Sequence, residues 1–456
     1  GLVLAGVGAA LTSDDEDVPR VEVAAGTNRL VTAGGDPLAA TNSPALVASP
    51  TDPSLLVVAA RVDRPELSAT LGRSTDGGDT WERTELPLPP GEVRRHAPDL
   101  AFDAEGALYA TYLTMSDPAN NPTGVWLARS DDGGATFDAP SRVAGPYAYQ
   151  PRVAVAGRSE AVYVTYLQAS AAVESVRDGL GPPPNPVMVV ASDDAGVSFS
   201  EPVDVSGDRE RVGAATPFVG PDGDVFVLYQ DFGTDAADFA ARPGPVHTGP
   251  FSLVLARSAD GGRTFSEASV VDEAVAPAER VNPYVPAYPS VAVDDSAATI
   301  YVAWSDATND DLDVFVRRSS DGGTTWGRRV QVNPAKGGAG THQLLPAVAV
   351  APTGRVDVAF VDRGAGGTDD DQAGAALATS FDNGATWRTV VVSDRFFDAR
   401  VGPESLTPGA ADLGSRTGLV AQPNQALEVW TDSRDGTVDT GRQDLYFAPI
   451  RIVPEN

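Results

Sequence analysis

An eight-residue pattern recurs six times along this chain, and its regular return constrains the fold more than any other feature of the sequence. The fullest copies read Ser-x-Asp-Gly-Gly-x-Thr-Trp, and neighbouring copies are separated by as few as 56 residues (Asp76 to Asp132) and as many as 66 (Asp194 to Asp260). A unit of that length cannot bury a core of its own, but it can stack on copies of itself. The sequence therefore predicts a chain built from one repeated unit.

Each octet has the composition of a tight turn. An aspartate can accept hydrogen bonds from the backbone just after it, and Gly-Gly or Asn-Gly supplies positive φ angles at little cost. The final Trp or Phe begins the next strand and can pack between repeats. Because no nucleophile stands beside a base, we interpret all six octet aspartates as structural, namely Asp76, Asp132, Asp194, Asp260, Asp321 and Asp382.

A second pattern lies upstream of each octet and predicts further strands. A proline is followed by alternating apolar residues, a turn and a second apolar run, as in residues 289–294 and 300–306. Proline is tolerated at the first residue of a strand, where we expect these markers to lie. The marker prolines are Pro44, Pro98, Pro151, Pro217, Pro289 and Pro346.

A seventh copy, over residues 418–448, has no octet and supplies only three strands. The missing strand is available near the start of the chain, in residues 21–25 or 28–32, and pairing the two ends would remove the exposed edges of a ring. We therefore predict an all-β fold, a β-propeller of seven four-stranded blades closed by an N-terminal strand, with six or eight blades as alternatives. The 46 glycines and 37 prolines suit many short strands joined by tight turns.

We expect one propeller domain over residues 20–453, preceded by a short segment of a different kind. Residues 1–11 are apolar, too few to span a bilayer, which needs about 20 residues, and an acidic run follows them. We interpret residues 1–19 as the end of a signal peptide or membrane anchor with an acidic linker, or else as a cloning remnant. The first interpretation predicts a secreted or cell-surface protein.

The charge and cysteine content exclude several functions. A net charge of −30 opposes binding to nucleic acids and to anionic membranes. The absence of cysteine excludes disulfides, zinc–thiolate sites and cysteine nucleophiles. We expect a monomer without a cofactor, and a partner that is a glycan, a small anionic molecule or another protein.

The strand order predicts which face carries function. If each blade is antiparallel, the octets join third to fourth strands on one face, and the connections into each first strand lie on the opposite face. Arginine and tyrosine are dense in those connections, which predicts a local basic patch able to hold an anionic ligand. The candidate ligand-binding residues are Asn42, His96, Tyr149, Gln150, Arg280, Tyr288 and Arg416. Two long, proline-rich loops, over residues 168–186 and 231–250, predict a cleft beside them.

An aspartate recurs at the end of the second strand in four repeats, at Asp231, Asp306, Asp362 and Asp432. A repeated position favours a structural role, in which these carboxylates bond neighbouring backbone or a nearby arginine. A structural Ca²⁺ bound by these aspartates and a catalytic role are the alternatives. His96 and His342 are more typical of hydrogen-bonding partners than of general bases.

The octets resemble the Asp-box (bacterial neuraminidase) repeat, which marks sialidases and a broad set of related exported propellers. Membership of the sialidases would imply a glycoside hydrolase in which three arginines hold the substrate carboxylate. It would also imply a tyrosine nucleophile assisted by a glutamate, and an aspartate acid/base. The chain departs from that pattern: the first arginine corresponds to residues 42–44, the late tyrosine corresponds to residues 415–417, and no tyrosine lies between Tyr301 and Tyr446. Sialidase rings have six blades, so one of the seven repeats predicted here would have no equivalent in them.

Three hypotheses follow. One is an exported sialidase-like propeller that binds a glycan or similar ligand opposite the octets without hydrolysing it. Another is an extracellular protein-interaction scaffold. The remaining one is an exo-α-sialidase-type glycoside hydrolase with a rearranged site. Its candidate catalytic residues are Arg95, Arg152, Arg280, Arg416, Tyr149, Tyr288 and Asp306. Three arginines converging beside a tyrosine or a carboxylate pair would favour the enzyme, whereas Asp–Arg pairs and small residues would favour binding or scaffolding.

Overall fold

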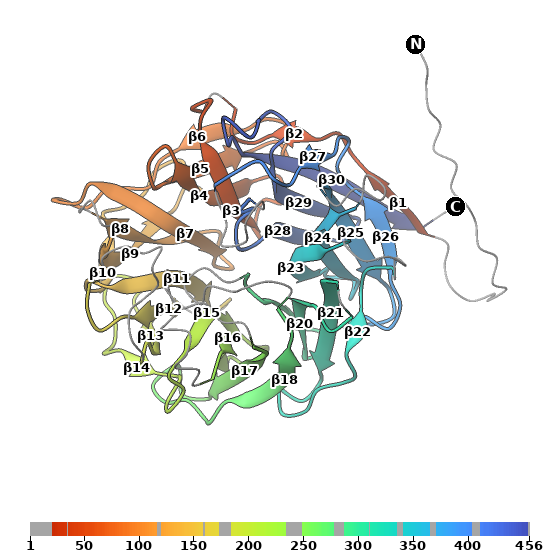
Figure 1. Ribbon diagram of the computed structural model, residues 1–456. Helices are drawn as coiled ribbons and strands as arrows, with labels where there is room; N and C mark the ends of the chain where they lie inside the picture. The colour runs from red at the N-terminus through yellow and green to blue at the C-terminus, as the bar shows by residue number, and fades with distance from the viewer. Residues whose placement is uncertain are drawn as a thin grey trace, which may run out of the picture.

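The computed structural model describes residues 21–33, 35–115, 120–157, 160–172, 184–233, 249–277, 287–309, 311–334, 341–364, 371–403 and 411–454. Every strand in these segments belongs to one of seven antiparallel sheets, which stand around a common centre (Figure 1). The described residues contain no helix. The predicted seven-bladed, all-β propeller is therefore confirmed.

The first three blades follow the chain in order. Blade 1 consists of β3 (Ala40–Ala48), β4 (Leu56–Arg64), β5 (Ser68–Ser74) and β6 (Glu82–Thr84). Blade 2 consists of β7 (Arg94–Phe102), β8 (Leu108–Met115), β9 (Pro122–Ser130) and β10 (Ser141–Ala144). Blade 3 consists of β11 (Ala148–Val155), β12 (Val162–Gln168), β13 (Val187–Ser192) and β14 (Val203–Asp204).

The next three blades repeat this arrangement. Blade 4 consists of β15 (Val212–Val219), β16 (Val225–Asp231), β17 (Phe251–Ser258) and β18 (Ser269–Val275). Blade 5 consists of β19 (Ser290–Asp294), β20 (Thr299–Asp306), β21 (Asp313–Ser319) and β22 (Val330–Gln331). Blade 6 consists of β23 (Gln343–Val350), β24 (Val356–Arg363), β25 (Gln372–Ser380) and β26 (Arg388–Val391), and β27 (Phe397–Asp398) also pairs with β25.

Blade 7 joins the two ends of the chain. It contains β28 (Gly418–Gln422), β29 (Gln425–Asp432) and β30 (Asp444–Pro454), and β30 pairs with both β1 (Val21–Ala25) and β2 (Arg29–Leu30). Both segments considered from the sequence thus take part, and the last strands, in blue, lie beside the first, in red (Figure 1). The predicted closure by an N-terminal strand is confirmed.

The marker prolines correct one detail of the prediction. Five inner strands contain a bulge with one residue at positive φ, and in four of them the next residue is the marker proline, namely Pro44, Pro98, Pro151 or Pro346. Only Pro289 immediately precedes its strand, and Pro217 lies in β15 beyond the bulge. A bulge leaves a residue without a ladder partner, so proline loses no hydrogen bond there.

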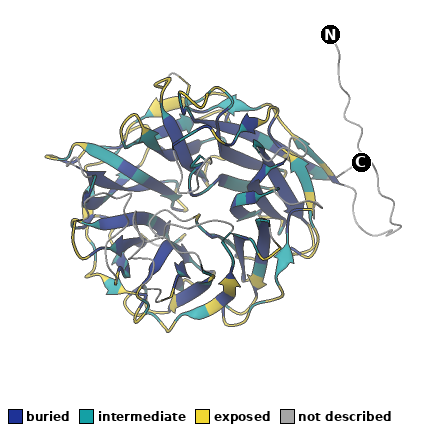
Figure 2. Cartoon of the chain, viewed as in Figure 1, coloured by how far each residue is buried: buried dark blue, intermediate teal, exposed yellow. Residues whose placement is uncertain are grey.

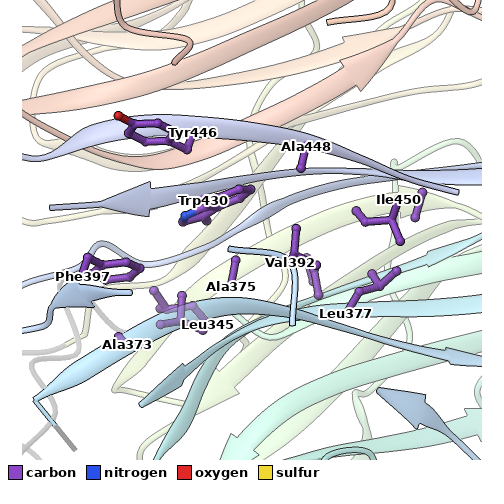
Figure 3. Close-up of a cluster of buried hydrophobic side chains, with 14 of the residues drawn as sticks. Leu345, Ala373, Ala375, Leu377, Val392, Phe397, Trp430, Tyr446, Ala448 and Ile450 are labelled. Atoms are coloured by element: carbon purple, nitrogen blue, oxygen red, sulfur yellow. The ribbon is translucent and has the colours of Figure 1, made fainter. Parts of the chain in front are cut away.

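The hydrophobic core lies between the blades. Every residue of β8 is buried, because a second strand is covered by a neighbouring blade on each face. Between blades 6 and 7, Leu377 and Phe397 lie opposite Trp430 and Ile450 (Figure 3). Exposed residues gather in turns and along the rim of the ring (Figure 2).

All six octets form the same hydrogen-bonded turn between the third and fourth strands. In blade 2, Asp132 accepts hydrogen bonds from the Ser130 hydroxyl (2.8 Å), the Thr136 N–H (2.8 Å) and the Thr136 hydroxyl (2.6 Å). The Ser130 hydroxyl in turn accepts the Gly134 N–H at 2.8 Å. The same four bonds recur at Asp76, Asp194, Asp260, Asp321 and Asp382. This geometry agrees with the structural interpretation of these aspartates.

Each octet also contacts the preceding blade. In blade 1, the Trp81 ring packs edge-on against Phe447 of blade 7, with 5.4 Å between ring centroids. Gly78 has a φ of 94°, and a Cβ at that position would stand 2.1 Å from the Phe447 ring. Only glycine permits both this backbone conformation and this approach. The octets therefore stabilise the contact between successive blades as well as their own hairpins.

The octet hydrogen bonds should contribute measurably to stability. Replacing Asp132 by alanine removes three of them, and because the turn is exposed we expect a loss of about 1 kcal/mol in the free energy of unfolding. Asp131→Ala is the matched control, since the Asp131 carboxylate makes only an exposed ion pair with Arg129. Denaturant unfolding of both variants should show a lower midpoint for Asp132→Ala alone.

The difference in the free energy of unfolding between wild type and Asp132→Ala should depend on pH. Burial raises the pKa of Asp132, but hydrogen bonds from Thr136 and Ser130 outweigh it and lower the pKa from 3.8 to about 2. A lowered folded-state pKa stabilises the protein above pH 3.8, and that stabilisation is lost as the pH falls toward 2. The difference between wild type and Asp132→Ala should therefore shrink over this range, and a constant difference would contradict the assignment.

A buried carboxyl group in blade 7 predicts the opposite pH dependence. Glu428 lies on the face of β29 that carries Ala426 and Trp430 toward blade 6, and its side chain is fully buried. Neither carboxyl oxygen has a hydrogen-bond partner among the described residues. Burial raises the pKa of Glu428 well above its ordinary value of 4.5.

Stability should accordingly decline as the pH rises above 4.5, because the unfolded chain then loses a proton that the folded protein keeps. Relative to Glu428→Gln, wild type should lose up to about 1.4 kcal/mol of unfolding free energy per pH unit until the folded-state pKa is reached. Urea denaturation at several pH values measures this slope, with Glu22→Gln, an exposed position in β1, as the control. Parallel profiles for wild type and Glu428→Gln would show that Glu428 is ionised in the folded protein.

Candidate functional site

Polar side chains from five blades meet around the axis of the ring, toward the face opposite the octets. They belong to inner strands, to the connections that lead into these strands and to the second half of β4. We call them the axial cluster, which comprises Asn42, Arg61, Asp63, His96, Asp99, Arg152, Tyr288, Asp412 and Arg416.

Asp99 is the centre of one half of this cluster. Its Oδ1 lies 3.1 Å from Nη1 of Arg416, which comes from the start of blade 7, and 3.4 Å from Nη1 of Arg152 in blade 3. Its Oδ2 accepts the backbone N–H of Val153 at 3.1 Å. Arg416 also donates to the carbonyls of Ser43 and Pro98, at 3.1 and 2.5 Å. One carboxylate thus joins blades 2, 3 and 7.

Tyr288 completes a circle of contacts around the axis. The Arg152 guanidinium lies 4.8 Å from the centre of the Tyr288 ring, and the Tyr288 backbone N–H donates to the Ser415 carbonyl at 2.9 Å. Contacts therefore run from blade 7 to blade 2, blade 3 and blade 5, and back to blade 7. Burial raises the pKa of Tyr288 to about 12, and Arg152 offsets only part of this effect. The half-buried phenol is therefore neutral at physiological pH.

Arg416 is positioned by the connection into blade 7, which lies against blade 1. The Ser415 N–H donates to the Ser43 hydroxyl at 2.9 Å, and the Gly414 N–H donates to Asp412 Oδ1 at 2.7 Å. Gly414 has a φ of 98°, and a Cβ there would stand 2.7 Å from the Ser43 backbone nitrogen. The approach therefore requires glycine.

The other half of the cluster centres on Asn42 and Arg61. Asn42 Nδ2 donates to Asp63 at 2.9 Å, and Asn42 Oδ1 accepts Arg61 Nε at 2.7 Å. Arg61 also donates to Asp412 at 2.9 Å. Asn42 is fully buried, so its side-chain amide bonds to the charged groups of Asp63 and Arg61 and not to solvent.

His96 is neutral in this setting. Burial lowers its pKa, although the nearby Asp63 acts in the opposite direction. Nδ1 lies 3.1 Å from the Ser68 carbonyl, which can only accept, so the proton belongs on Nδ1. Nε2 is 4.0 Å from Asp63, beyond hydrogen-bonding distance. The expected role of His96 as a hydrogen-bonding partner agrees with this geometry.

The charges of the axial cluster balance, so these side chains by themselves do not form the predicted basic patch. Its three arginines, Arg61, Arg152 and Arg416, stand beside three aspartates, Asp63, Asp99 and Asp412. With His96 and Tyr288 neutral, these side chains carry no net positive charge. The density of arginine in the sequence overstated the positive potential, because the partner aspartates come from distant parts of the chain.

The structure places the other candidate residues elsewhere. Tyr149 is fully buried between blades 3 and 4, and its hydroxyl donates to Asn121, so it contacts no ligand in this conformation. Gln150 accepts the Ala214 N–H at 2.8 Å, across the same interface. Arg95 lies near Tyr112 and takes no part in the ion pairs of the cluster. Arg280 and most of the two long loops lie outside the described residues, so the predicted cleft beside those loops stays a prediction.

The four repeated aspartates bond to neighbouring groups. Asp231 pairs with Arg209 and Asp306 with Arg329, while Asp362 accepts the Gln343 amide and Asp432 binds Arg434 through both carboxylate oxygens. Asp306 and Asp432 are fully buried. Within the described segments, no group of three or more His, Cys, Asp or Glu residues is arranged to hold a metal ion. This geometry fits the structural interpretation, and no pairing places Asp306 in the axial cluster.

Three residues of the cluster were missed by the sequence analysis: Arg61, Asp99 and Asp412. A signal was available for Asp99, because Asp99 and Arg152 both directly follow a marker proline. The equivalent residues in blades 1, 5 and 6 are Ala45, Ser290 and Ala347. Charge at this repeat position therefore breaks the symmetry of the ring. Asp412 offers no such signal, since it lies in a connection without repeat equivalents.

Comparison with known proteins establishes the fold but no family. No family model matches the chain, and no curated protein matches it in sequence. A protein of unknown function from Dyadobacter fermentans is similar over 95% of this chain and 100% of its own, with a TM-score of 0.52 and 15% identity. The phage phi92 endosialidase is similar over 94% of this chain and 70% of its own, with a TM-score of 0.52 and 13% identity.

The Hadza microbial sialidase Hz136 gives a TM-score of 0.48 at 16% identity, over 88% of this chain and 74% of its own. At identities of 15% and 13%, the similarity to the Dyadobacter fermentans protein and to the phi92 endosialidase shows a shared β-propeller fold and nothing about activity. The resemblance to sialidase-like propellers is therefore confirmed for the fold. Among the described residues, no helix is long and apolar enough to cross a membrane.

The close approach at Gly414 predicts a position-specific effect. Gly414→Ala and Gly91→Ala both place alanine at positive φ, 98° and 87°, but a Cβ at residue 91 would meet nothing within 4 Å. Backbone strain of about 1 kcal/mol should be common to both variants. Thermal unfolding should show a larger loss for Gly414→Ala, because its Cβ would separate the connection from Ser43. Equal losses would show that the connection adjusts without displacing Arg416.

Proposed function

We propose that this protein is an exported propeller that binds a glycan through the axial cluster, on the face opposite the octets. The observation that carries the proposal is the convergence of carboxylate acceptors and guanidinium donors from four blades beside the half-buried Tyr288 of a fifth blade. Sugar hydroxyls both donate and accept hydrogen bonds, so they match a surface on which donors and acceptors alternate. The similarity of fold to a phage endosialidase is consistent with a carbohydrate ligand.

The geometry favours binding over hydrolysis. Arg152 and Arg416 both already contact Asp99, and a third cluster arginine, Arg61, contacts Asp63 and Asp412. Asp306, the aspartate considered as a catalyst, is fully buried and paired with Arg329. The convergence of three arginines beside a tyrosine keeps a glycoside hydrolase of the exo-α-sialidase type as the second candidate. A protein-interaction scaffold is the third.

We infer the cellular setting from the sequence. A net charge of −30 suits an extracellular protein that stays soluble and separate from nucleic acids. Together with the apolar residues 1–11, it supports export, a single domain over residues 20–453 and a monomeric state. Size-exclusion chromatography coupled to light scattering tests the last of these.

Binding should weaken when the half-buried aromatic group of the cluster, Tyr288, is removed. On a glycan array, Tyr288→Ala should bind at least about tenfold more weakly than wild type, because truncating an aromatic contact residue commonly costs more than 1 kcal/mol. Phe381→Ala is the matched control, since Phe381 is an exposed aromatic residue in the octet of blade 6. Equal binding by wild type and Tyr288→Ala would contradict the proposed site.

A panel of fluorogenic glycosides, sialosides included, tests hydrolysis with the same proteins. We expect no turnover by wild type. Turnover that disappears in Tyr288→Phe would establish the hydrolase and a catalytic role for the Tyr288 hydroxyl. Absence of both binding and turnover would leave the scaffold.

A further inference from the structure

Two arginines from different blades converge on a single carboxylate that belongs to the protein itself. Arg152 comes from β11, Arg416 precedes β28, and Asp99 reaches them from β7. Guanidinium groups held in this way are typical of sites that recognise a carboxylate. In this chain the carboxylate is supplied internally.

We propose that Asp99 determines ligand specificity: its carboxylate occupies the place between Arg152 and Arg416 that the carboxylate of an acidic sugar would otherwise take, so the site selects neutral glycans. The inference rests on the proposed function and adds to it the charge class of the ligand. Asp99 acts by filling this place, which makes it a specificity residue and not a catalytic one.

The contacts of Asp99 support this assignment. Oδ1 faces both arginines, at 3.1 and 3.4 Å, while Oδ2 is held by the Val153 N–H, so the carboxylate has a fixed orientation. Its side chain is only 8% exposed, and those of Arg152 and Arg416 are 15% and 12% exposed. Burial raises the pKa of Asp99 overall, although Arg152 and two backbone N–H groups act in the opposite direction. The two guanidinium groups that contact Oδ1 favour the ionised form of the carboxyl group.

A second carboxylate would meet unfavourable electrostatics here. It would lie beside the ionised Asp99 in a cluster without surplus positive charge, in a protein with a net charge of −30. A neutral hydroxyl meets no such repulsion. The Nε and Nη1 atoms of Arg152 are buried, so a hydroxyl group would meet the part of the Arg152 side chain that stays exposed, which is 15% of it. The same cluster thus disfavours acidic sugars and can still bind hydroxyl groups.

Chemical rescue tests the position of the carboxylate without any glycan. Asp99→Ala removes a carboxylate of the size of formate, so formate should raise the melting temperature of this variant. Formamide and sodium chloride at equal concentration should not, because one lacks the charge and the other lacks the shape. Wild type and Asp99→Asn, in which the space stays filled, should show no effect of formate. Absence of rescue in Asp99→Ala, or equal rescue in Asp99→Asn, would overturn the inference.

Glycan binding supplies the second test, with probes paired so that only the carboxylate differs. Terminal glucose is compared with terminal glucuronic acid, and sialylated glycans with their desialylated forms. Wild type should prefer the neutral member, and Asp99→Asn should shift the preference toward the acidic member by at least about tenfold, since one unit of negative charge is removed beside two arginines. Asp99→Asn is isosteric, so it remains informative if Asp99→Ala does not fold.

The outcomes separate the inference from the proposed function. Tighter binding of acidic glycans by wild type would overturn the inference and leave glycan binding intact. A failure of wild type and both variants to bind any glycan would overturn the proposed function, and the formate experiment would then decide whether Asp99 occupies a carboxylate site. An unchanged preference in Asp99→Asn would also overturn the inference.

Discussion

No blade of this protein can bury its own hydrophobic surface, and the rest of the structure follows from that constraint. The second strands are covered on both faces by neighbouring blades, so each sheet depends on the next around the ring. The octets contribute to the same contacts, since Trp81 and Gly78 of blade 1 pack on Phe447 of blade 7. The pairing of β1 and β2 with β30 leaves no blade without a neighbour.

The closed ring places the beginnings of seven inner strands around one axis, and this explains how distant residues come to share a site. Arg416 and Asp99 are separated by 317 positions in the sequence but form an ion pair, because Asp99 lies within the inner strand β7 and Arg416 just before the inner strand β28. The bulges of the inner strands fix the backbone near these positions. A repeated scaffold therefore carries an unrepeated cluster of polar side chains.

The axial cluster shows why residue type alone is a poor guide to electrostatic potential. Arginines in the connections suggested a basic patch, yet the structure pairs Arg152 and Arg416 with Asp99, and Arg61 with Asp63 and Asp412. A balanced, hydrogen-bonded cluster suits a ligand rich in hydroxyl groups better than an anion. The charge class of the ligand thus depends on pairings made across the ring.

The sequence by itself determined a propeller of repeated blades, with seven as the predicted number and six or eight as alternatives, together with the position of the octets at hairpin turns and the closure of the ring by an N-terminal strand. These features are local or periodic: the octet turn is made by residues within six positions of one another, and the blades repeat at a regular interval. Only the tertiary structure decided that Tyr149 is buried, that Asp99 joins three blades and that Asp412 reaches Arg61. These contacts join residues that are far apart in the chain and occur once each. The repeat marks Asp99 as an exception, but no period or spacing in the sequence could reveal the partners in these contacts.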